Sequence, residues 1–323
     1  MTTLPPYDAG DQKSLVSRLR AELDEALVLL REVQQIEDTP VSKHGLALPP
    51  NLLEQCLALC AEHGAMQPEP IRTVHHFACT GGTLFSKCIA AQPNVQLLSE
   101  VDPLSTLGKE ITKPQFAPTD MVTLLRQSTR GTSSKLLVDL FLANLSAIHA
   151  GCERSGLRLV LRDHAHSHFC EGVEVPERPT LREMLVSQYE ILSVLTVRHP
   201  VESYLSLMAN GWLHFIPPTL DEYCRRYTAF LTAYDGVPIV RYEDLVSAPE
   251  ATMSTICTHL DMQFNPDFVD LFDVYRLTGD SGRSGGTIAP RPSKNLSGEL
   301  ADEIRSSREL RNLISMLGYD WAD

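Results

Sequence analysis

The sequence lacks the features of a secreted or membrane-spanning protein. The first residues, Met1 to Asp8, show no basic start followed by an apolar run, and no uninterrupted apolar stretch is long enough to cross a bilayer. The eight cysteines have no Cys-x-x-Cys spacing, which is typical of reduced thiols in a cytosol. We therefore expect a cytoplasmic protein without an integral membrane segment.

Patterns that bind metal ions are also scarce. Without paired cysteines a zinc site is disfavoured, and the one dense histidine cluster, His164-Ala-His166-Ser-His168, has no matching cysteine or acidic cluster nearby. A catalytic or structural role explains this cluster better than metal binding does. We expect no metal cofactor.

Positive charge is in short supply. The chain has 28 Lys and Arg residues against 41 Asp and Glu residues, which gives a formal net charge of -13. Nucleic acids and anionic membrane surfaces reward a surplus of positive charge, so broad binding to either is disfavoured. An anionic ligand must instead be held by a few local groups.

The 323 residues are enough for one large α/β domain with an N-terminal extension. In residues 12–38 apolar side chains recur every three or four positions with charged residues between them, which predicts an amphipathic helix; a second helix is expected over 50–65. The first helix either packs on the main domain or mediates self-association into a homo-oligomer. We divide the chain into a helical extension, residues 1–70, and a main domain, residues 71–323.

From residue 72 onward, short β-branched runs alternate with longer helical stretches. This alternation predicts an α/β fold with a central, mostly parallel sheet flanked by helices. Ligands of such folds bind beyond the carboxyl ends of the strands, where the turn after Phe77, the segment Arg162 to His164, and Arg198 would all lie. The expected strands span residues 73–77, 157–161, 191–197 and 237–240, and the expected helices 84–91, 135–153, 201–210, 220–234, 251–260 and 297–317.

One turn in this pattern is typical of a phosphate-binding site. An apolar strand leads into Thr80-Gly81-Gly82-Thr83 and then into a helical pattern, which aims backbone N–H groups and a helix N-terminus at an anion. No lysine and hydroxyl pair follows the second glycine, so magnesium-dependent hydrolysis of ATP or GTP and kinase activity are disfavoured. A tight turn without a ligand is the alternative interpretation.

This turn resembles the loop that binds the 5'-phosphosulfate in sulfotransferases that use 3'-phosphoadenosine 5'-phosphosulfate (PAPS). The family form is Arg/Lys-Ser/Thr-Gly-Thr/Gly-Thr, and the chain matches it at every position but the first. The resemblance covers roughly residues 72–295 and implies a P-loop-like sulfotransferase fold with PAPS as co-substrate. The implied contacts to the 5' end of PAPS are Cys79, Thr80, Gly81, Gly82, Thr83 and Leu84.

Two later segments carry the same resemblance. Arg198, with Ser206 eight residues later, has the spacing of the family's 3'-phosphate element. A guanidinium suits this task because it makes charge-assisted, bidentate bonds to phosphate; an ion pair of Arg198 with Glu202 or Glu243 is the alternative. The glycine- and serine-rich segment 278–295 resembles a late loop that closes over the nucleotide, which implies a contact from Arg283.

The resemblance offers two candidates for the base that removes the acceptor proton. Glu100 lies near the position of a base glutamate in some sulfotransferase branches, and His164, in Leu161-Arg-Asp-His, resembles the base histidine of a Lys-Thr-His segment in the cytosolic branch. A base contributes on the order of 10²- to 10⁴-fold to the rate. A loop carboxylate and a structural histidine are the alternatives, and the sequence does not choose between the two candidates.

Cys79 departs from the family form, because most members have lysine or arginine there to stabilise the bridging oxygen. Lys87 in the following helix or Arg162 could supply the missing charge; a solvated lysine and a surface ion pair are their alternatives. If nothing replaces it, the chain could be a non-catalytic nucleotide sensor or assembly protein. The leading hypothesis is an enzyme, a PAPS-dependent sulfotransferase.

No sequence feature identifies the acceptor. A hydroxyl of a small molecule, lipid or carbohydrate is expected, and an amine less so. The pocket for it should be formed by residues 100–130, 164–180 and 210–220. Ordinary packing is the alternative role for the aromatic and histidine side chains in these ranges, which are His166, His168, Phe169, Trp212, His214 and Phe215.

Overall fold

The computed structural model describes residues 68–107, 116–279, 286–290 and 298–321. The predicted extension lies outside these ranges except for its last residues, as do Arg283 and most of the predicted late loop. The helices are α3 (Gly82–Ala90), α4 (Met121–Arg126), α5 (Ser134–Arg154), α6 (His166–Phe169), α7 (Leu181–Leu185), α8 (Pro200–Ala209), α9 (Leu220–Ala233), α10 (Tyr242–Ser247), α11 (Pro249–His259), α12 (Phe268–Leu271), η1 (Phe272–Val274, a 3₁₀ turn), α13 (Gly298–Ser306) and α14 (Arg308–Leu317).

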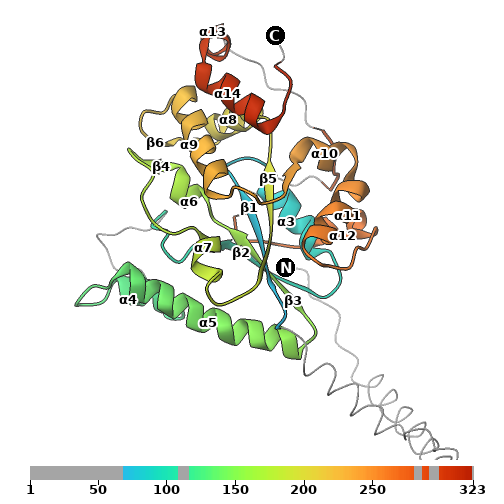
Figure 1. Cartoon of the computed structure of the whole chain (residues 1–323). Helices are drawn as coiled ribbons and strands as arrows, with labels where there is room; N and C mark the ends of the chain where they lie inside the picture. Colours follow the sequence, from blue (N-terminus) through green and yellow to red (C-terminus); the bar gives the residue numbers. More distant parts are fainter. Residues whose placement is uncertain (1–67, 108–115, 280–285, 291–297, 322–323) are drawn as a thin grey trace, which may run out of the picture. The chain divides into compact units, whose positions relative to one another are not determined.

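A five-stranded parallel sheet forms the centre of the fold, in the order β2-β3-β1-β5-β7 (Figure 1). This confirms the predicted α/β class. Strand β1, in the middle, is buried along its whole length, as expected for a strand covered on both faces. The strands are β1 (Ile71–His76), β2 (Val95–Val101), β3 (Arg158–Asp163), β5 (Ile191–Val197) and β7 (Ile239–Arg241), and two short strands, β4 (Glu171–Gly172) and β6 (His214–Phe215), pair separately.

Helices cover both faces of the sheet. On one face, Val74, Val160, Val194 and Val240 pack in one hydrophobic cluster with side chains of α3, α10 and α11. On the other face, Leu195 and neighbouring side chains pack with α8, α9 and α14. Because successive side chains of a strand point to opposite faces, the β-branched runs supply both clusters.

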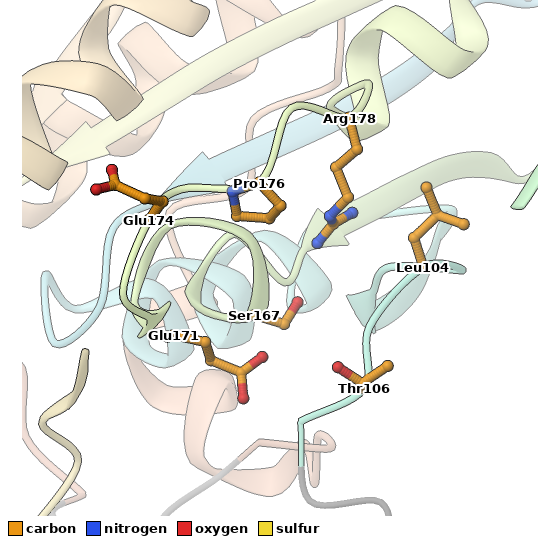
Figure 2. A pocket seen from close by; sticks show the side chains of 8 residues that line it. Leu104, Thr106, Ser167, Glu171, Glu174, Pro176 and Arg178 are labelled. Carbon is orange, nitrogen blue, oxygen red and sulfur yellow. The ribbon is translucent and has the colours of Figure 1, made fainter. Parts of the chain in front are cut away.

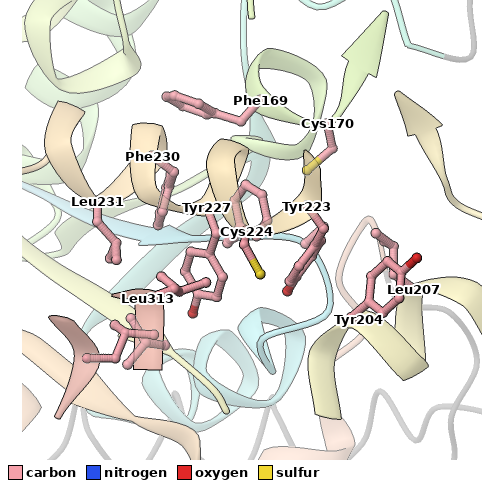
Figure 3. Close-up of a cluster of buried hydrophobic side chains, with 14 of the residues drawn as sticks. Phe169, Cys170, Tyr204, Leu207, Tyr223, Cys224, Tyr227, Phe230, Leu231 and Leu313 are labelled. Atoms are coloured by element: carbon pink, nitrogen blue, oxygen red, sulfur yellow. The ribbon is translucent and has the colours of Figure 1, made fainter. Parts of the chain in front are cut away.

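Aromatic side chains anchor the end of β1 from the second face (Figure 3). Phe77, the residue after β1, is fully buried and stacks on Tyr227 at 4.5 Å between ring centroids. Tyr223 meets the same ring edge-on at 5.4 Å, and Phe230 lies 5.5 Å away. This packing fixes the point at which the predicted phosphate turn leaves the sheet.

A buried polar network lies beside this aromatic cluster. His75 Nδ1 donates to Asp163 Oδ2 at 2.8 Å, and Tyr234 Oη donates to the same oxygen at 2.5 Å. Burial and the neighbouring Asp163 raise the pKa of Tyr234 well above its usual value, so its hydroxyl keeps the proton it donates. The network ties the end of β3 to β1 and α9, so that Arg162 and His164, on either side of Asp163, are held at the sheet edge.

Two differences from the predicted elements have local causes. Strand β2 was not predicted, because its sequence, Val-Gln-Leu-Leu-Ser-Glu-Val, mixes polar and apolar residues around a register shift between Leu98 and Val101. The predicted last helix is divided in two at Ser307. The Ser307 side chain accepts a hydrogen bond from the N–H of Leu310 and so starts α14 as a new helix.

Within the described part of the chain, α5 alone is long and apolar enough to cross a membrane by length and composition. One such helix is weak evidence for a membrane segment, because a helix that packs on a sheet passes the same test. Here Leu142 and Leu145 of α5 pack in a cluster with Leu159 and Leu161 of β3. The exposed side of α5 carries apolar residues such as Leu136 and Ile148 as well as polar ones.

The aromatic anchor can be tested by Phe77→Ala. We expect the free energy of unfolding to fall by about 3–5 kcal/mol, because the change removes a fully buried ring and leaves a cavity. Phe116, 96% exposed, is the matched control, and Phe116→Ala should change stability by less than about 0.5 kcal/mol. Denaturant unfolding measures both, and equal effects would contradict the anchor.

Candidate functional site

The glycine turn joins β1 to α3 at the carboxyl edge of the sheet. Cys79 and Gly81 have positive φ angles of 61° and 94°, and α3 starts at Gly82 without a side-chain cap. A Cβ on Gly81 would overlap the ring of Tyr242, so both the backbone conformation and the space require glycine. An uncapped helix start at this edge is a place where an anion can meet backbone N–H groups.

The two threonines of the turn have different roles. The Thr80 hydroxyl is buried and donates to the Phe77 carbonyl at 2.7 Å, which closes the turn on itself. The Thr83 hydroxyl accepts from Arg162 Nη2 at 3.1 Å and lies 3.4 Å from the carbonyl oxygen of Gly279, to which it donates. Thr83 therefore faces the residues from other strands, whereas Thr80 stabilises the turn.

Arg162 contacts residues of β1, β2, the glycine turn and the segment at Thr278. Although it is a charged residue, only 3% of its surface is exposed. Its Nε donates to His76 Nε2 at 2.9 Å, Nη1 donates to Ser99 Oγ at 3.0 Å and to the Thr278 carbonyl at 3.3 Å, and Nη2 lies 2.8 Å from Glu100 Oε1. A buried guanidinium needs partners of this kind to offset its loss of hydration.

The structure brings the two candidate bases, Glu100 and His164, together. His164 Nε2 lies 3.3 Å from Glu100 Oε2, and both side chains keep some access to solvent. Glu100 has a positive φ of 61° at the irregular end of β2, a conformation rare for glutamate that turns its side chain toward Arg162. Pairing across β2 and β3 is a long-range contact that neither sequence segment reveals by itself.

Arg198 lies directly after β5, as predicted. Its guanidinium carbon is 4.8 Å from the centre of the Tyr242 ring, and Nη2 pairs with Glu202 at 3.3 Å. The alternative partner, Glu243, accepts instead from the His199 N–H and from Tyr319 Oη. Because Tyr242 also covers Gly81, one ring links the glycine turn to the end of β5.

Ser206 lies on the buried face of α8, the helix that follows Arg198. The structure thus places it in the element adjoining the predicted 3'-phosphate arginine, on its second turn. Leu84 lies in the first turn of α3, where its N–H bonds to the Gly81 carbonyl at 2.9 Å. Arg283, the last of the predicted donor contacts, lies outside the described residues.

The side chains around Cys79 show which residue could replace the lysine or arginine that most family members have at this position. The Cys79 thiol lies 3.6 Å from Asn210 Nδ2, a neutral donor. Lys87, one predicted substitute, is buried on α3 with Nζ 3.7 Å from Asp273 of η1. Arg162, the other, contacts Thr83 of the turn itself. Arg162 therefore brings a positive charge to the glycine turn through its hydrogen bond to Thr83.

A cavity of about 320 Å³ opens beside the site (Figure 2). In Figure 2 the side chains of Thr106 and Glu171 turn toward each other, and Ser167 lies between them on α6. Its lining falls within two of the ranges predicted for the acceptor pocket and consists of Leu104, Thr106, Ser167, Glu171, Gly172, Glu174, Pro176 and Arg178. Partial burial raises the pKa of Glu171.

Asp102 holds two of the side chains that line this cavity, Arg178 and Ser167. Arg178 makes two bonds to its carboxylate, at 3.0 and 2.7 Å, and Ser167 Oγ donates to it at 2.5 Å. Burial by itself would raise the pKa of Asp102, but these bonds hold it below its usual value. The charge of Arg178 is therefore already matched, and the remaining carboxylates make the cavity wall acidic.

The other side chains predicted near the acceptor divide into two groups. His168, Phe169 and Phe215 are buried, and His168 Nε2 bonds to the Pro176 carbonyl, so packing explains them. His166 lies between His164, Trp212 and His214, with ring centroids 6.3, 6.3 and 5.9 Å away. Burial lowers the pKa of His166 to about 4, so its ring is neutral near pH 7.

Sequence reasoning missed several residues of the site. Tyr242 could have been suspected from the segment Val240-Arg-Tyr-Glu-Asp-Leu, which resembles the strand-and-helix segment that often follows the 3'-phosphate element in the family. His76, Ser99 and Thr278 carried no such signal, because their roles arise from contacts with Arg162 across the fold. Within the described residues, no cluster of three His, Cys, Asp or Glu side chains could hold a metal ion.

Comparison with known families gives one match. Residues 192–266 match the model of the sulfotransferase family. The matched segment contains β5 from Leu192 onward, Arg198, Ser206 and Tyr242, and it ends before the late loop. The predicted resemblance to sulfotransferases is thereby confirmed for this part of the chain. A comparison with curated protein sequences gives no significant match.

Several solved structures resemble the chain weakly. The sulfotransferase domain from the curacin biosynthetic pathway is 16% identical over 80% of this chain and 100% of that one, with a TM-score of 0.49. The sulfotransferase domain of the Synechococcus PCC 7002 olefin synthase is 19% identical over 79% and 97%, with a TM-score of 0.49. Mouse sulfotransferase SULT7A1 complexed with PAP is 11% identical over 77% and 89%, with a TM-score of 0.38. Structural similarity at this level is too weak to support a statement about activity.

The close packing of the glycine turn can be tested by Gly81→Ala. The new methyl group would meet the Tyr242 ring, so we expect a loss of about 1–3 kcal/mol beyond the cost of the positive φ itself. Gly131→Ala is the matched control, because Gly131 has a φ of 65° with nothing near its Cβ position. Denaturant unfolding that gave both variants the same stability would show that Tyr242 does not pack against the turn.

Proposed function

We propose that the protein is a sulfotransferase that moves a sulfuryl group from PAPS to a hydroxyl group of its acceptor. The observation that carries this proposal is the meeting, at one sheet edge, of an uncapped glycine turn, a buried arginine and a carboxylate–histidine pair. The family match over residues 192–266 supports it independently, because that segment supplies Arg198 from the next strand.

The donor would be bound at both of its ends. The N–H groups at the start of α3 would hold the 5'-phosphosulfate, which the positive end of the helix dipole also favours. Arg198 would exchange its partner Glu202 for the 3'-phosphate, with Ser206 adding a hydroxyl from α8. Such local groups suffice for a polyanion even though the chain carries an excess of negative charge.

The reaction requires an in-line displacement at sulfur. The acceptor oxygen forms a bond to sulfur while the bond from sulfur to the bridging oxygen breaks, and the leaving 3'-phosphoadenosine 5'-phosphate (PAP) takes that electron pair. The acceptor proton passes to a base on the protein. Positioning of the reactants and stabilisation of the charge on the leaving phosphate supply most of the rate enhancement in a transfer of this kind.

We assign the proton transfer to His164 and an orienting role to Glu100. The Glu100 carboxylate already has its charge matched by Arg162 through Oε1, and its Oε2 lies against His164 Nε2. A carboxylate in that position keeps a proton on Nε2, so that Nδ1 can accept the proton of the acceptor. Many hydrolases pair a histidine base with an orienting carboxylate in the same way. Arg162 lies beside both and would face the sulfuryl oxygens.

The acceptor would enter from the cavity beside α6. Its volume of about 320 Å³ suits part of a small molecule, or one sugar or lipid head group of a larger one. The acidic wall around Glu171 and Glu174 disfavours an anionic acceptor. A hydroxyl acceptor remains our first expectation and an amine our second.

A second function is favoured by Cys79. A neutral thiol at the first position of the loop cannot stabilise a bridging oxygen, so the chain could bind the nucleotide as a sensor or assembly protein without transferring sulfate. Both functions require the donor site, but only the enzyme transfers the sulfuryl group to an acceptor. Arg162 supports the enzyme, since it brings a cation to the same turn.

The two-ended donor site predicts a ligand preference. PAP should raise the melting temperature more than ATP does, because ATP has no 3'-phosphate for Arg198. Arg198→Ala should weaken PAP binding by about 10- to 100-fold, the loss expected for one or two charge-assisted bonds, measured by calorimetry. Adenosine 5'-phosphosulfate, which lacks the 3'-phosphate, should bind both forms equally.

Arg305→Ala is the matched control, because Arg305 is exposed and pairs with Asp302 of its own helix. It should leave both affinities unchanged. If Arg198→Ala weakened the two nucleotides alike, Arg198 would be a structural residue. If PAP and ATP gave the same stabilisation in the wild type, the donor assignment would be wrong.

Catalysis is tested by transfer of labelled sulfate from PAPS to a panel of hydroxyl acceptors. His164→Ala should lower kcat by about 10²- to 10⁴-fold, the usual contribution of a positioned base. Added imidazole should restore part of this activity, whereas acetate should not restore Glu100→Ala. Rescue of Glu100→Ala by acetate alone would make Glu100 the base, and tight PAP binding without transfer to any acceptor would favour the sensor.

A further inference from the structure

We propose that His76 is a positioning residue, which holds the Arg162 guanidinium against the glycine turn so that it meets the sulfuryl group. This inference rests on the proposed sulfotransferase function. His76 is the last residue of β1, one residue before Phe77, and so lies where the central strand leads into the turn. No sequence motif marks it.

The hydrogen bonds of His76 allow one tautomer. Its Nδ1 lies 3.2 Å from the Phe77 carbonyl oxygen, which can only accept, so Nδ1 carries a hydrogen. Its Nε2 lies 2.9 Å from Arg162 Nε, which can only donate, so Nε2 carries none. The ring is therefore a neutral acceptor for the arginine and a donor to the backbone of the turn.

The surroundings keep the ring neutral. Burial, followed by the charge of Arg162, lowers the pKa of His76 well below its usual value; His164 and His166 act in the same direction. A charged ring would have to present a second N–H to the guanidinium. A neutral His76 therefore accepts a hydrogen bond from Arg162, while the positive charge of Arg162 stays paired with Glu100.

Gly82 shows that the ring and the turn are fitted to each other. A Cβ at Gly82 would overlap three atoms of the His76 ring, including Nε2. The backbone of Gly82 has an ordinary helical conformation at the start of α3, so lack of space rather than an unusual φ requires glycine here. His76 therefore touches the turn through Gly82 and Arg162 through Nε2.

These contacts position the Arg162 guanidinium, which supplies the positive charge that a cysteine at position 79 cannot supply. With Nε fixed by His76 on β1 and Nη1 by Ser99 on β2, the guanidinium plane has one orientation, and Nη2 lies at Thr83 of the turn. Loss of His76 would remove its contact to Nε and leave the guanidinium held through its two Nη atoms, which permits a shift in its position. A misplacement of about 1 Å near reacting atoms can cost on the order of 10² in rate.

Two substitutions separate positioning from folding. His76→Gln keeps an acceptor near the position of Nε2, and His76→Leu removes it at similar bulk. We expect His76→Leu to lower kcat by about 10- to 100-fold and His76→Gln to retain most of the activity. PAP has no sulfuryl group and keeps its contacts to the N–H groups of the turn and to Arg198, so its affinity should change much less than kcat does in both variants. A collapsed turn would instead weaken PAP binding as well.

A second measurement does not need turnover. In ¹⁵N NMR spectra the His76 ring should show the neutral form with the proton on Nδ1, and the Arg162 Nε–H should exchange slowly with solvent. His76→Leu should abolish that protection. Gly82→Ala should also disturb it, whereas Gly82→Ala in a His76→Ala background should be tolerated better than the two single effects predict, because the overlap is gone.

The transfer assay, the NMR spectra and the double-mutant cycle each test a separate part of the proposal. A wild type that transfers no sulfate overturns the proposed function, and the NMR signals then still test the placement of Arg162 by His76. Transfer by the wild type with unchanged kcat in His76→Leu overturns the positioning role. So does a charged ring, or a double-mutant cycle in which the effects at positions 76 and 82 are additive.

Discussion

The buried guanidinium of Arg162 is the interaction on which the site depends. A cation with so little exposed surface is stable only when its donors are matched, and its partners come from two neighbouring strands, one helix and the start of the late loop. Each partner is thereby fixed in place as well. Glu100 and through it His164 are aligned at one edge of the sheet by the same charge.

Local concentration of positive charge explains how an acidic protein could bind a polyanion. The chain carries a net charge of -13, yet Arg162, Arg198 and an uncapped helix start lie around one turn. Tyr242 packs on both Gly81 and Arg198, so the two ends of the donor site are coupled through one ring. The acidic cavity wall lies on the acceptor side, which separates the two substrates by charge.

The sequence predicted the layers of the fold well, because alternating strands and helices leave a clear pattern around β1, β5 and α5. It also placed Arg162, His164 and Arg198 at the correct sheet edge, since parallel strands share a carboxyl end. It could not predict β2, whose polar residues face the site, nor the contact of Glu100 with His164. Those depend on a backbone irregularity and on contacts between distant segments, as does the fit of His76 to Gly82.

The central claim is that one nucleotide is held between the glycine turn and the end of β5. A crystal structure of the protein with PAP tests it most directly. We predict the 5'-phosphate at the N–H groups of Gly82 and Thr83, close to Arg162, with the 3'-phosphate on Arg198 in place of Glu202. A nucleotide bound elsewhere, or one whose 3'-phosphate left the Arg198–Glu202 pair intact, would contradict the account.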